Sequence, residues 1–192
     1  MDEKCCNKVV ILGDASVGKT TLVQRYKNGE KLLDLPEPSV QFSEMVFQKV
    51  VHGNEIQIKI WDTVGQEKYR GITPLIMKNA SVGLFIYCDD IEGSFDSLSE
   101  WVSHFDQSCN GSKIIVYSKI DLSRSNIAKG KEFASSIGAQ FFKTSSISGE
   151  GVDELFNYIF EIVAEKQNEY KTMDSSIEIS SNGKSNESSS CC

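Results

Sequence analysis

Residues 13–20, Gly-Asp-Ala-Ser-Val-Gly-Lys-Thr, constrain the fold of this 192-residue chain more than any other segment. They match the pattern G-x-x-x-x-G-K-[ST] and lie between an apolar run at 9–12 and a helix-like segment at 21–26. Gly13 and Gly18 allow the backbone to curl with its N–H groups turned inward, and the start of a helix adds partial positive charge. The segment therefore predicts a strand, a phosphate-binding loop and a helix in succession.

Two side chains of this loop have specific predicted roles in binding a nucleotide. Lys19 would reach the β- and γ-phosphates of a nucleotide, and the Thr20 hydroxyl would hold Mg²⁺. The other residues would contribute mainly backbone N–H groups. The predicted phosphate-binding residues of the loop are Gly13, Asp14, Ala15, Ser16, Val17, Gly18, Lys19 and Thr20.

Composition narrows the class of protein. With 40% hydrophobic residues the chain can build one ordinary core, and its net charge of −7 excludes a broad basic surface for nucleic acid. Its six cysteines lack zinc spacing, which favours a reducing compartment. No secretory signal or membrane-length apolar run is visible, so we expect a cytosolic protein unless a lipid is added.

Strand-like and helical patterns alternate through to about residue 168, which predicts a three-layer α/β fold with a mostly parallel sheet. Two strands, 41–51 and 55–61, are joined by His52-Gly53-Asn54 and form the expected antiparallel hairpin. From Lys171 onward the sequence is rich in serine and predicts a flexible tail over residues 171–192. Further strands are expected at 84–87, 114–117 and 141–142, with amphipathic helices around 95–105 and 152–163.

Three further motifs follow strands. Asp62 ends one strand near the expected metal, Gly65 can bring its N–H to a γ-phosphate, and Gln66 can orient an attacking water.

Asp121, in Ser-Lys-Ile-Asp at 118–121, can accept hydrogen bonds from guanine N1–H and N2–H₂, which adenine lacks, while Lys119 lays its stem over the base. Thr-Ser-Ser at 144–146 offers backbone N–H groups to guanine O6. The carboxyl ends of parallel strands share one sheet edge, so these motifs converge.

These motifs together resemble the small GTPase superfamily over residues 7 to about 168. Residues 60–67, Ile-Trp-Asp-Thr-Val-Gly-Gln-Glu, are close to the Rab pattern W-D-T-A-G-Q-E, and Trp101 and the ending Ser190-Cys191-Cys192 also look Rab-like. The resemblance implies a P-loop GTPase fold with six strands, helices on both faces and GTP/GDP cycling with Mg²⁺. It also implies a role in vesicle and membrane traffic, with a GTPase domain at 1–170 and a hypervariable tail at 171–192.

The resemblance also assigns roles to residues. It implies metal ligation by Thr20, Ser39 and, through water, Asp62, with Gln66 catalytic and effector contacts near 36–48 and 62–78. The implied guanine-binding set is Ser118, Lys119, Asp121, Ser145, Ser146 and Ile147.

Several positions depart from the family pattern. Ser39 stands where the family has Thr, and Ala15 and Val64 add bulk near the attacking water, which predicts slow hydrolysis without an activating protein. Ser118 replaces the usual Asn and predicts weaker nucleotide binding with faster exchange. Ile147 replaces a lysine of the S-A-K motif. The altered segment after Ser39 predicts effectors different from those of an ordinary Rab.

Cys191 and Cys192 resemble the double-geranylgeranyl signal of Rabs. One lipid gives marginal membrane binding and two give stable anchoring, and the tail offers few basic residues as a second signal. The implied location is the cytosol and the cytosolic face of endomembranes. Cys5 and Cys6 are candidates for palmitoylation or for packing. The implied partners of a monomeric switch are an exchange factor, a GTPase-activating protein, a GDP-dissociation inhibitor and a prenylation escort protein.

Two other readings remain open at this point. The chain could be a Rab-like binding module with negligible hydrolysis, as Ala15, Ser39 and Val64 favour, although Gln66 argues against it. It could be a P-loop nucleotide kinase, although the Asp121 motif and the lack of an Arg-rich lid argue against that. The two tryptophans, Trp61 and Trp101, are expected to serve packing rather than catalysis.

Overall fold

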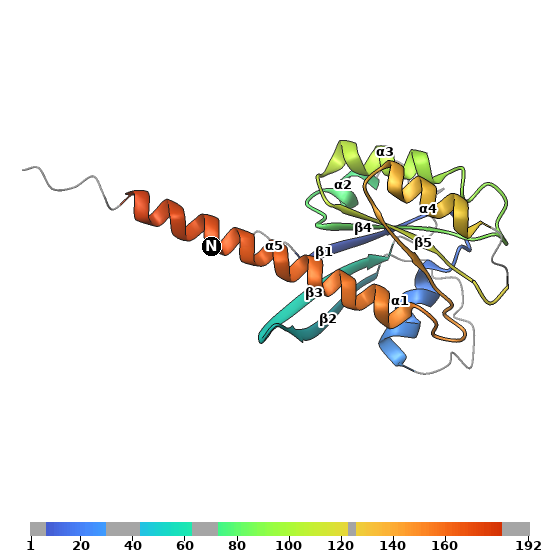
Figure 1. Cartoon of the computed structure of the whole chain (residues 1–192), viewed down its shortest axis with the longest axis horizontal. Helices are drawn as coiled ribbons and strands as arrows, with labels where there is room; N and C mark the ends of the chain where they lie inside the picture. The colour runs from blue at the N-terminus through green and yellow to red at the C-terminus, as the bar shows by residue number, and fades with distance from the viewer. Residues whose placement is uncertain (1–6, 30–42, 63–72, 123–125, 182–192) are drawn as a thin grey trace, which may run out of the picture.

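The computed structural model describes residues 7–29, 43–62, 73–122 and 126–181 (Figure 1). Strands and helices alternate along most of the chain, and each apolar run of the sequence becomes one of them. The strands are β1 (Lys8–Leu12), β2 (Ser43–Val51), β3 (Asn54–Asp62), β4 (Val82–Tyr87), β5 (Ser112–Tyr117) and β6 (Gln140–Lys143). The helices are α1 (Lys19–Asn28), α2 (Thr73–Met77), α3 (Leu98–Ser108), α4 (Ile127–Ser136) and α5 (Val152–Ser181).

The strands form a six-stranded sheet in the order β2-β3-β1-β4-β5-β6. All neighbouring pairs are parallel except β2 and β3, which run antiparallel at one edge. Their hairpin turns through His52 and Gly53, with φ of 49° and 79°, and two residues with positive φ are typical of a type I′ turn. The predicted fold class, a mostly parallel sheet with one antiparallel edge hairpin, is confirmed.

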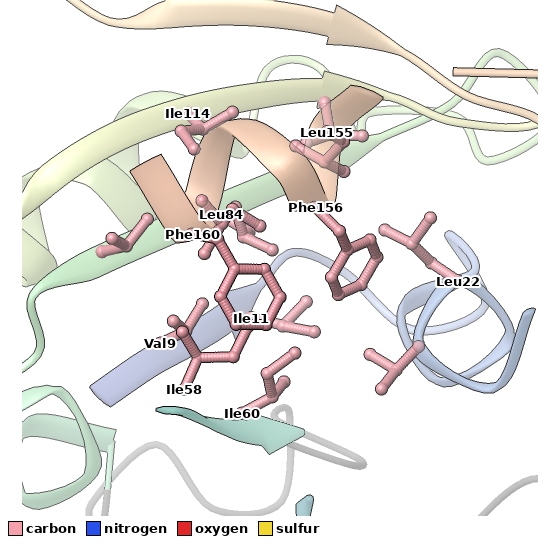
Figure 2. Close-up of a cluster of buried hydrophobic side chains, with 14 of the residues drawn as sticks. Val9, Ile11, Leu22, Ile58, Ile60, Leu84, Ile114, Leu155, Phe156 and Phe160 are labelled. Atoms are coloured by element: carbon pink, nitrogen blue, oxygen red, sulfur yellow. The ribbon is translucent and has the colours of Figure 1, made fainter. Parts of the chain in front are cut away.

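Helices cover both faces of the sheet and give three layers (Figure 1). Helices α1 and α5 pack on one face, where Phe156 and Phe160 of α5 lie among aliphatic side chains of the central strands (Figure 2). Helices α2, α3 and α4 pack on the other face around Phe85, Phe105 and Tyr117. Strands β1, β4 and β5 are buried from both sides, which explains their continuous apolar sequences.

The parallel arrangement brings the carboxyl ends of five strands to one edge of the sheet. The loop after β1 starts at Gly13, β3 ends at Asp62, and β5 is followed by Ser118. Residues 88–90 follow β4 and residues 144–146 follow β6. All motifs singled out in the described sequence therefore reach the edge at which open parallel sheets bind ligands.

Helix α5 ends later in the chain than the sequence predicted. It continues through residues 171–181, which the sequence analysis assigned to the tail, and it projects away from the sheet (Figure 1). These residues contain no glycine or proline, so nothing in the local sequence stops a helix that is already packed upstream. Residues 182–192 lie outside the described part of the chain. Among the described helices, none has the length and apolar character needed to cross a membrane.

Candidate nucleotide-binding site

The loop between β1 and α1 has the backbone that its glycines predicted. Gly13 has φ of 139°, and a Cβ there would lie 2.3 Å from the carbonyl oxygen of Ile86 on β4. Ser16 and Gly18 also have positive φ, at 63° and 100°, so the backbone adopts the left-handed region at both residues before α1 begins at Lys19. The N-cap of α1 is Gly18, which has no side chain to cap the helix, and the N-terminus of a helix is a suitable place for an anion.

Lys19 is held inside this loop. Its side chain is buried, and its Nζ donates hydrogen bonds to the carbonyl oxygens of Gly13 at 2.8 Å and Asp14 at 2.6 Å. The two carbonyls place the ammonium within the curve of the backbone, next to the N-terminus of α1. An ammonium in this position adds charge to the backbone donors and suits phosphate oxygens.

Thr20 and Asp62 meet beside Lys19, across the gap between α1 and β3. The Thr20 hydroxyl donates to Asp62 Oδ2 at 2.6 Å, and Asp62 is completely buried. Burial raises the pKa of Asp62 above its usual range, against the opposing effects of the Thr20 hydrogen bond and the Lys19 charge. Within the described structure its second oxygen, Oδ1, is buried with no hydrogen-bond partner.

An orphaned buried carboxylate oxygen next to a hydroxyl fits a divalent cation. Hydroxyl and carboxylate oxygens are the ligands that Mg²⁺ prefers, and a cation would offset the cost of burying the Asp62 charge. Thr20 and Asp62 are thus the described residues that would hold Mg²⁺, directly or through water. Ser39, the third predicted ligand, lies outside the described residues.

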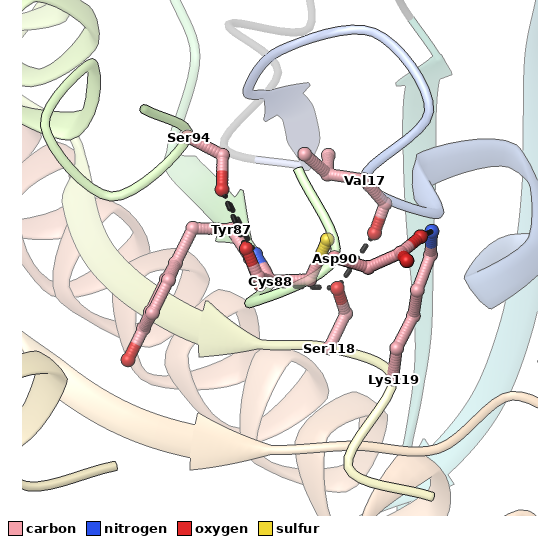
Figure 3. A network of polar contacts seen from close by, with 7 residues as sticks. All are labelled: Val17, Tyr87, Cys88, Asp90, Ser94, Ser118 and Lys119. Atoms are coloured by element: carbon pink, nitrogen blue, oxygen red, sulfur yellow. Dashed lines mark hydrogen bonds and ion pairs between the residues drawn. The ribbon is translucent and has the colours of Figure 1, made fainter. Parts of the chain in front are cut away.

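Ser118 ties the loop after β5 to the phosphate loop. Its Oγ lies 2.6 Å from the Val17 carbonyl oxygen and 3.0 Å from that of Tyr87 (Figure 3). A hydroxyl has one proton, so the shorter contact to Val17 takes most of it. A single hydroxyl donor therefore connects the loop after β5 to the phosphate loop.

Lys119 makes a contact that the sequence analysis missed. Its backbone has φ of 55°, and its Nζ pairs with Asp90 Oδ2 at 2.9 Å (Figure 3). Asp90 follows β4, whose carboxyl end lies at the same edge as the other motifs. That position was the signal available in the sequence: an acidic pair, Asp89-Asp90, one residue beyond a buried strand.

Asp121 and Ser145, which the sequence places in one guanine-binding set, are in direct contact. Ser145 Oγ donates to Asp121 Oδ1 at 2.5 Å and accepts from the N–H of Ser148 at 3.1 Å. The backbone N–H of Ser145 is already bonded to the Glu150 carbonyl at 2.9 Å. The N–H of Thr144 is likewise bonded, to the Tyr117 carbonyl at 2.8 Å, so of the N–H groups expected at 144–146 that of Ser146 remains for a base oxygen.

Trp101 has a polar partner in addition to its packing. Its ring packs against the core on the side of α3, as expected, and its Nε1–H also donates to Asp14 Oδ1 in the phosphate loop at 3.0 Å.

The remaining predicted site residues, Gly65, Gln66, Cys191 and Cys192, lie outside the described residues, as do Val64, Cys5 and Cys6.

Comparison with known proteins agrees with this geometry. Residues 8–165 match the model of the Ras family. The chain is 37% identical over 155 residues to Ras-related protein Rab-21 of Geodia cydonium, covering 78% of this chain and 67% of that protein. It is 32% identical over 185 residues to Rab-11B of Dictyostelium discoideum, covering 93% and 82%. Human Rab-21 is 33% identical over 155 residues, covering 78% and 68%.

A phosphate loop at the carboxyl edge of this sheet, with Thr20 and Asp62 beside it, defines a P-loop GTPase, and the chain belongs to the Ras family. Within that family it is a Rab-type small GTPase.

Proposed function

We propose that this protein is a Mg²⁺-dependent switch that binds GTP and GDP, hydrolyses GTP and regulates vesicle and membrane traffic. The observation that carries the proposal is the convergence of two side-chain groups at one sheet edge. Lys19, Thr20 and Asp62 form the phosphate and metal end, and Asp121 with Ser145 forms the base end.

At the phosphate end, the loop backbone and Lys19 bind the phosphates and Thr20 and Asp62 hold the cation. Mg²⁺ would neutralise charge on the β- and γ-phosphates. Gly65 would donate its N–H to the γ-phosphate, Ser39 would complete the metal shell, and Gln66 would orient the attacking water. Loss of the γ-phosphate would release the segments near 36–48 and 62–78, through which effectors would read the state of the switch.

At the base end, Asp121 selects guanine. Its carboxylate can accept from guanine N1–H and N2–H₂, whereas adenine would leave a desolvated carboxylate partly unpaired. Ser145 supports this role because its hydroxyl holds Asp121 in place at 2.5 Å. Ser118 and Lys119 would complete the corner with Ser146 and Ile147, and Ile147 is 45% exposed and so presents an apolar edge.

A nucleotide-binding assay tests the proposal directly. Dissociation constants for GDP and ADP are measured with Mg²⁺ present, and GDP is expected to bind on the order of 10⁴-fold more tightly. The Asp121→Ala variant should lose most of that preference, while Glu150→Ala, nearby in the loop before α5, is the matched control. Equal competition by ADP would contradict the proposal that Asp121 selects guanine.

We further propose slow intrinsic hydrolysis that an activating protein accelerates by supplying an arginine. Ala15 and Val64 add bulk where the attacking water would sit, which is the support for slow chemistry. Single-turnover hydrolysis should rise in Ala15→Gly and Val64→Ala. Unchanged rates in both variants would remove this steric explanation.

The division into a GTPase domain at 1–170 and a tail at 171–192 remains our proposal, with Cys191 and Cys192 prenylated. The lipids would place the protein on the cytosolic face of endomembranes, and a GDP-dissociation inhibitor and an escort protein would carry them through the cytosol. An exchange factor and an activating protein would set the state of the switch, and the GTPase itself would act as a monomer.

A further inference from the structure

A hydrogen bond connects helix α3 to the phosphate loop. The indole Nε1–H of Trp101 donates to Asp14 Oδ1 at 3.0 Å, and the two residues are 87 positions apart in the chain. Asp14 is the second residue of the loop, directly after the glycine that passes close to β4. The contact therefore spans from the outer helical layer to the backbone that surrounds the phosphate site.

Helix α3 presents this donor from a fixed position. Leu98 and Phe105 are fully buried on the same helix, and Val102 is nearly so. The Phe105 ring meets Phe85 of β4 edge to face, with ring centroids 5.4 Å apart. These buried residues lie on either side of Trp101 and anchor the helix to the sheet, so the indole N–H approaches Asp14 from a packed element.

Asp14 has two partners, one on each side of the loop. Its carboxylate accepts from Trp101, and its backbone carbonyl accepts from Lys19 Nζ at 2.6 Å. Asp14 thus links Trp101, through its carboxylate, to the Lys19 ammonium, through its backbone carbonyl oxygen. Hydrogen bonds to an ionised group are about twice as strong as those between neutral groups.

The direction in which the charged Asp14 carboxylate points affects the binding of phosphate. A carboxylate within a phosphate-binding loop repels phosphate oxygens and competes with them for the nearby ammonium. Bound to the indole, this carboxylate is directed toward α3 instead. Among the residues that the structure describes, no second hydrogen bond holds the carboxylate on that side.

We propose that Trp101 is a positioning residue for nucleotide binding: by holding the Asp14 carboxylate on the α3 side, it slows the release of bound nucleotide. The proposal rests on the nucleotide-binding function argued above and assigns that site a residue outside its motifs. Trp101 acts through Asp14 and does not itself touch the nucleotide.

The test measures GDP dissociation in a two-by-two set of variants. Trp101→Phe keeps a ring for packing and removes the N–H, and we expect GDP release about tenfold faster. Asp14→Asn supplies a second background in which the carboxylate charge is absent. There, adding Trp101→Phe should accelerate release less than about threefold, because no misdirected charge remains.

A role in packing alone would give a different pattern. In that case Trp101→Phe would accelerate release equally in both backgrounds, and the proposal would be overturned; no acceleration in the native background would overturn it as well. Gln107→Ala, on the exposed side of α3, is the matched helix control and should leave release unchanged. If the unaltered protein fails to bind GDP, the proposed function fails first, and the inference falls with it.

Discussion

At the scale of single residues, Gly13 shows how closely the phosphate loop passes the sheet. Gly13→Ala should abolish GDP binding, because the new Cβ would collide with the Ile86 carbonyl at 2.3 Å while the backbone is held at φ of 139°. Gly29→Ala is the matched control, since Gly29 has positive φ but no atom within 4 Å of a Cβ. It should cost only about 1–2 kcal/mol of unfolding free energy and leave GDP binding intact. Calorimetric titration with GDP and thermal unfolding check both variants.

Ser118 offers a second prediction at this scale. Ser118→Ala removes the donor to the Val17 carbonyl, while the Tyr87 carbonyl keeps its bond from the Ser118 N–H. Losing one hydrogen bond of about 1 kcal/mol should speed GDP release about fivefold, measured with a fluorescent GDP analogue. Ser118→Asn adds a second donor and should slow release below that of the unaltered protein. A release rate that does not fall in Ser118→Asn would contradict this account.

At the scale of elements, an aromatic stack joins the helix of the phosphate loop to the last helix. Tyr26 of α1 and Phe156 of α5 have parallel rings with centroids 3.8 Å apart, and Phe47 of β2 leans against both. Phe156 is completely buried, so the orientation of α1 depends on a contact with a helix far along the chain.

Truncating this stack should be costly. Phe156→Ala should lower the free energy of unfolding by about 3–5 kcal/mol, because a large ring is removed from a fully buried position. Tyr158→Ala, on the same helix but only partly buried against Phe142, should cost under about 2 kcal/mol. Urea unfolding at a fixed, saturating GDP concentration compares the two. Equal losses would contradict the expectation that the fully buried ring in the stack contributes more to stability than the partly buried one.

At the scale of the whole molecule, the proposed lipids decide where the protein resides. Among the described residues no helix can cross a membrane, and the net charge of −7 opposes attraction to anionic lipids. In the fully prenylated protein, two chains should give stable vesicle binding. Cys191→Ser, with one chain left, should bind only marginally and reversibly, and a variant lacking both cysteines should not bind. Vesicle co-sedimentation measures this, and equal binding by the one-chain variant would contradict the need for two lipids.

The fold could be predicted from the sequence because its signals are local. Buried parallel strands need continuous apolar runs, and the loop at 13–20 needs glycine where φ is positive, so both leave a pattern in neighbouring residues. The topology of parallel sheets then places the ends of those strands together. The sequence could thus assign Thr20 and Asp62 to one metal site and Asp121 and Ser145 to one base site, while the hydrogen bonds within each pair came from the structure.

The bond of Trp101 to Asp14 left no such pattern, and the acidic pair after β4 indicated a position at the sheet edge but not that Asp90 would pair with Lys119. Each contact depends on how one packed element is rotated about its axis and where it lies along that axis relative to its neighbour. In a helix, successive side chains differ in direction by about 100°. A shift of one residue in the packing of α3 would direct the indole elsewhere without altering any local preference. The sequence therefore defined the sheet, the loop and the chemistry at its edge. Tertiary packing alone settled which side chains hold that loop in place, because contacts between distant elements are set by geometry that neighbouring residues do not encode.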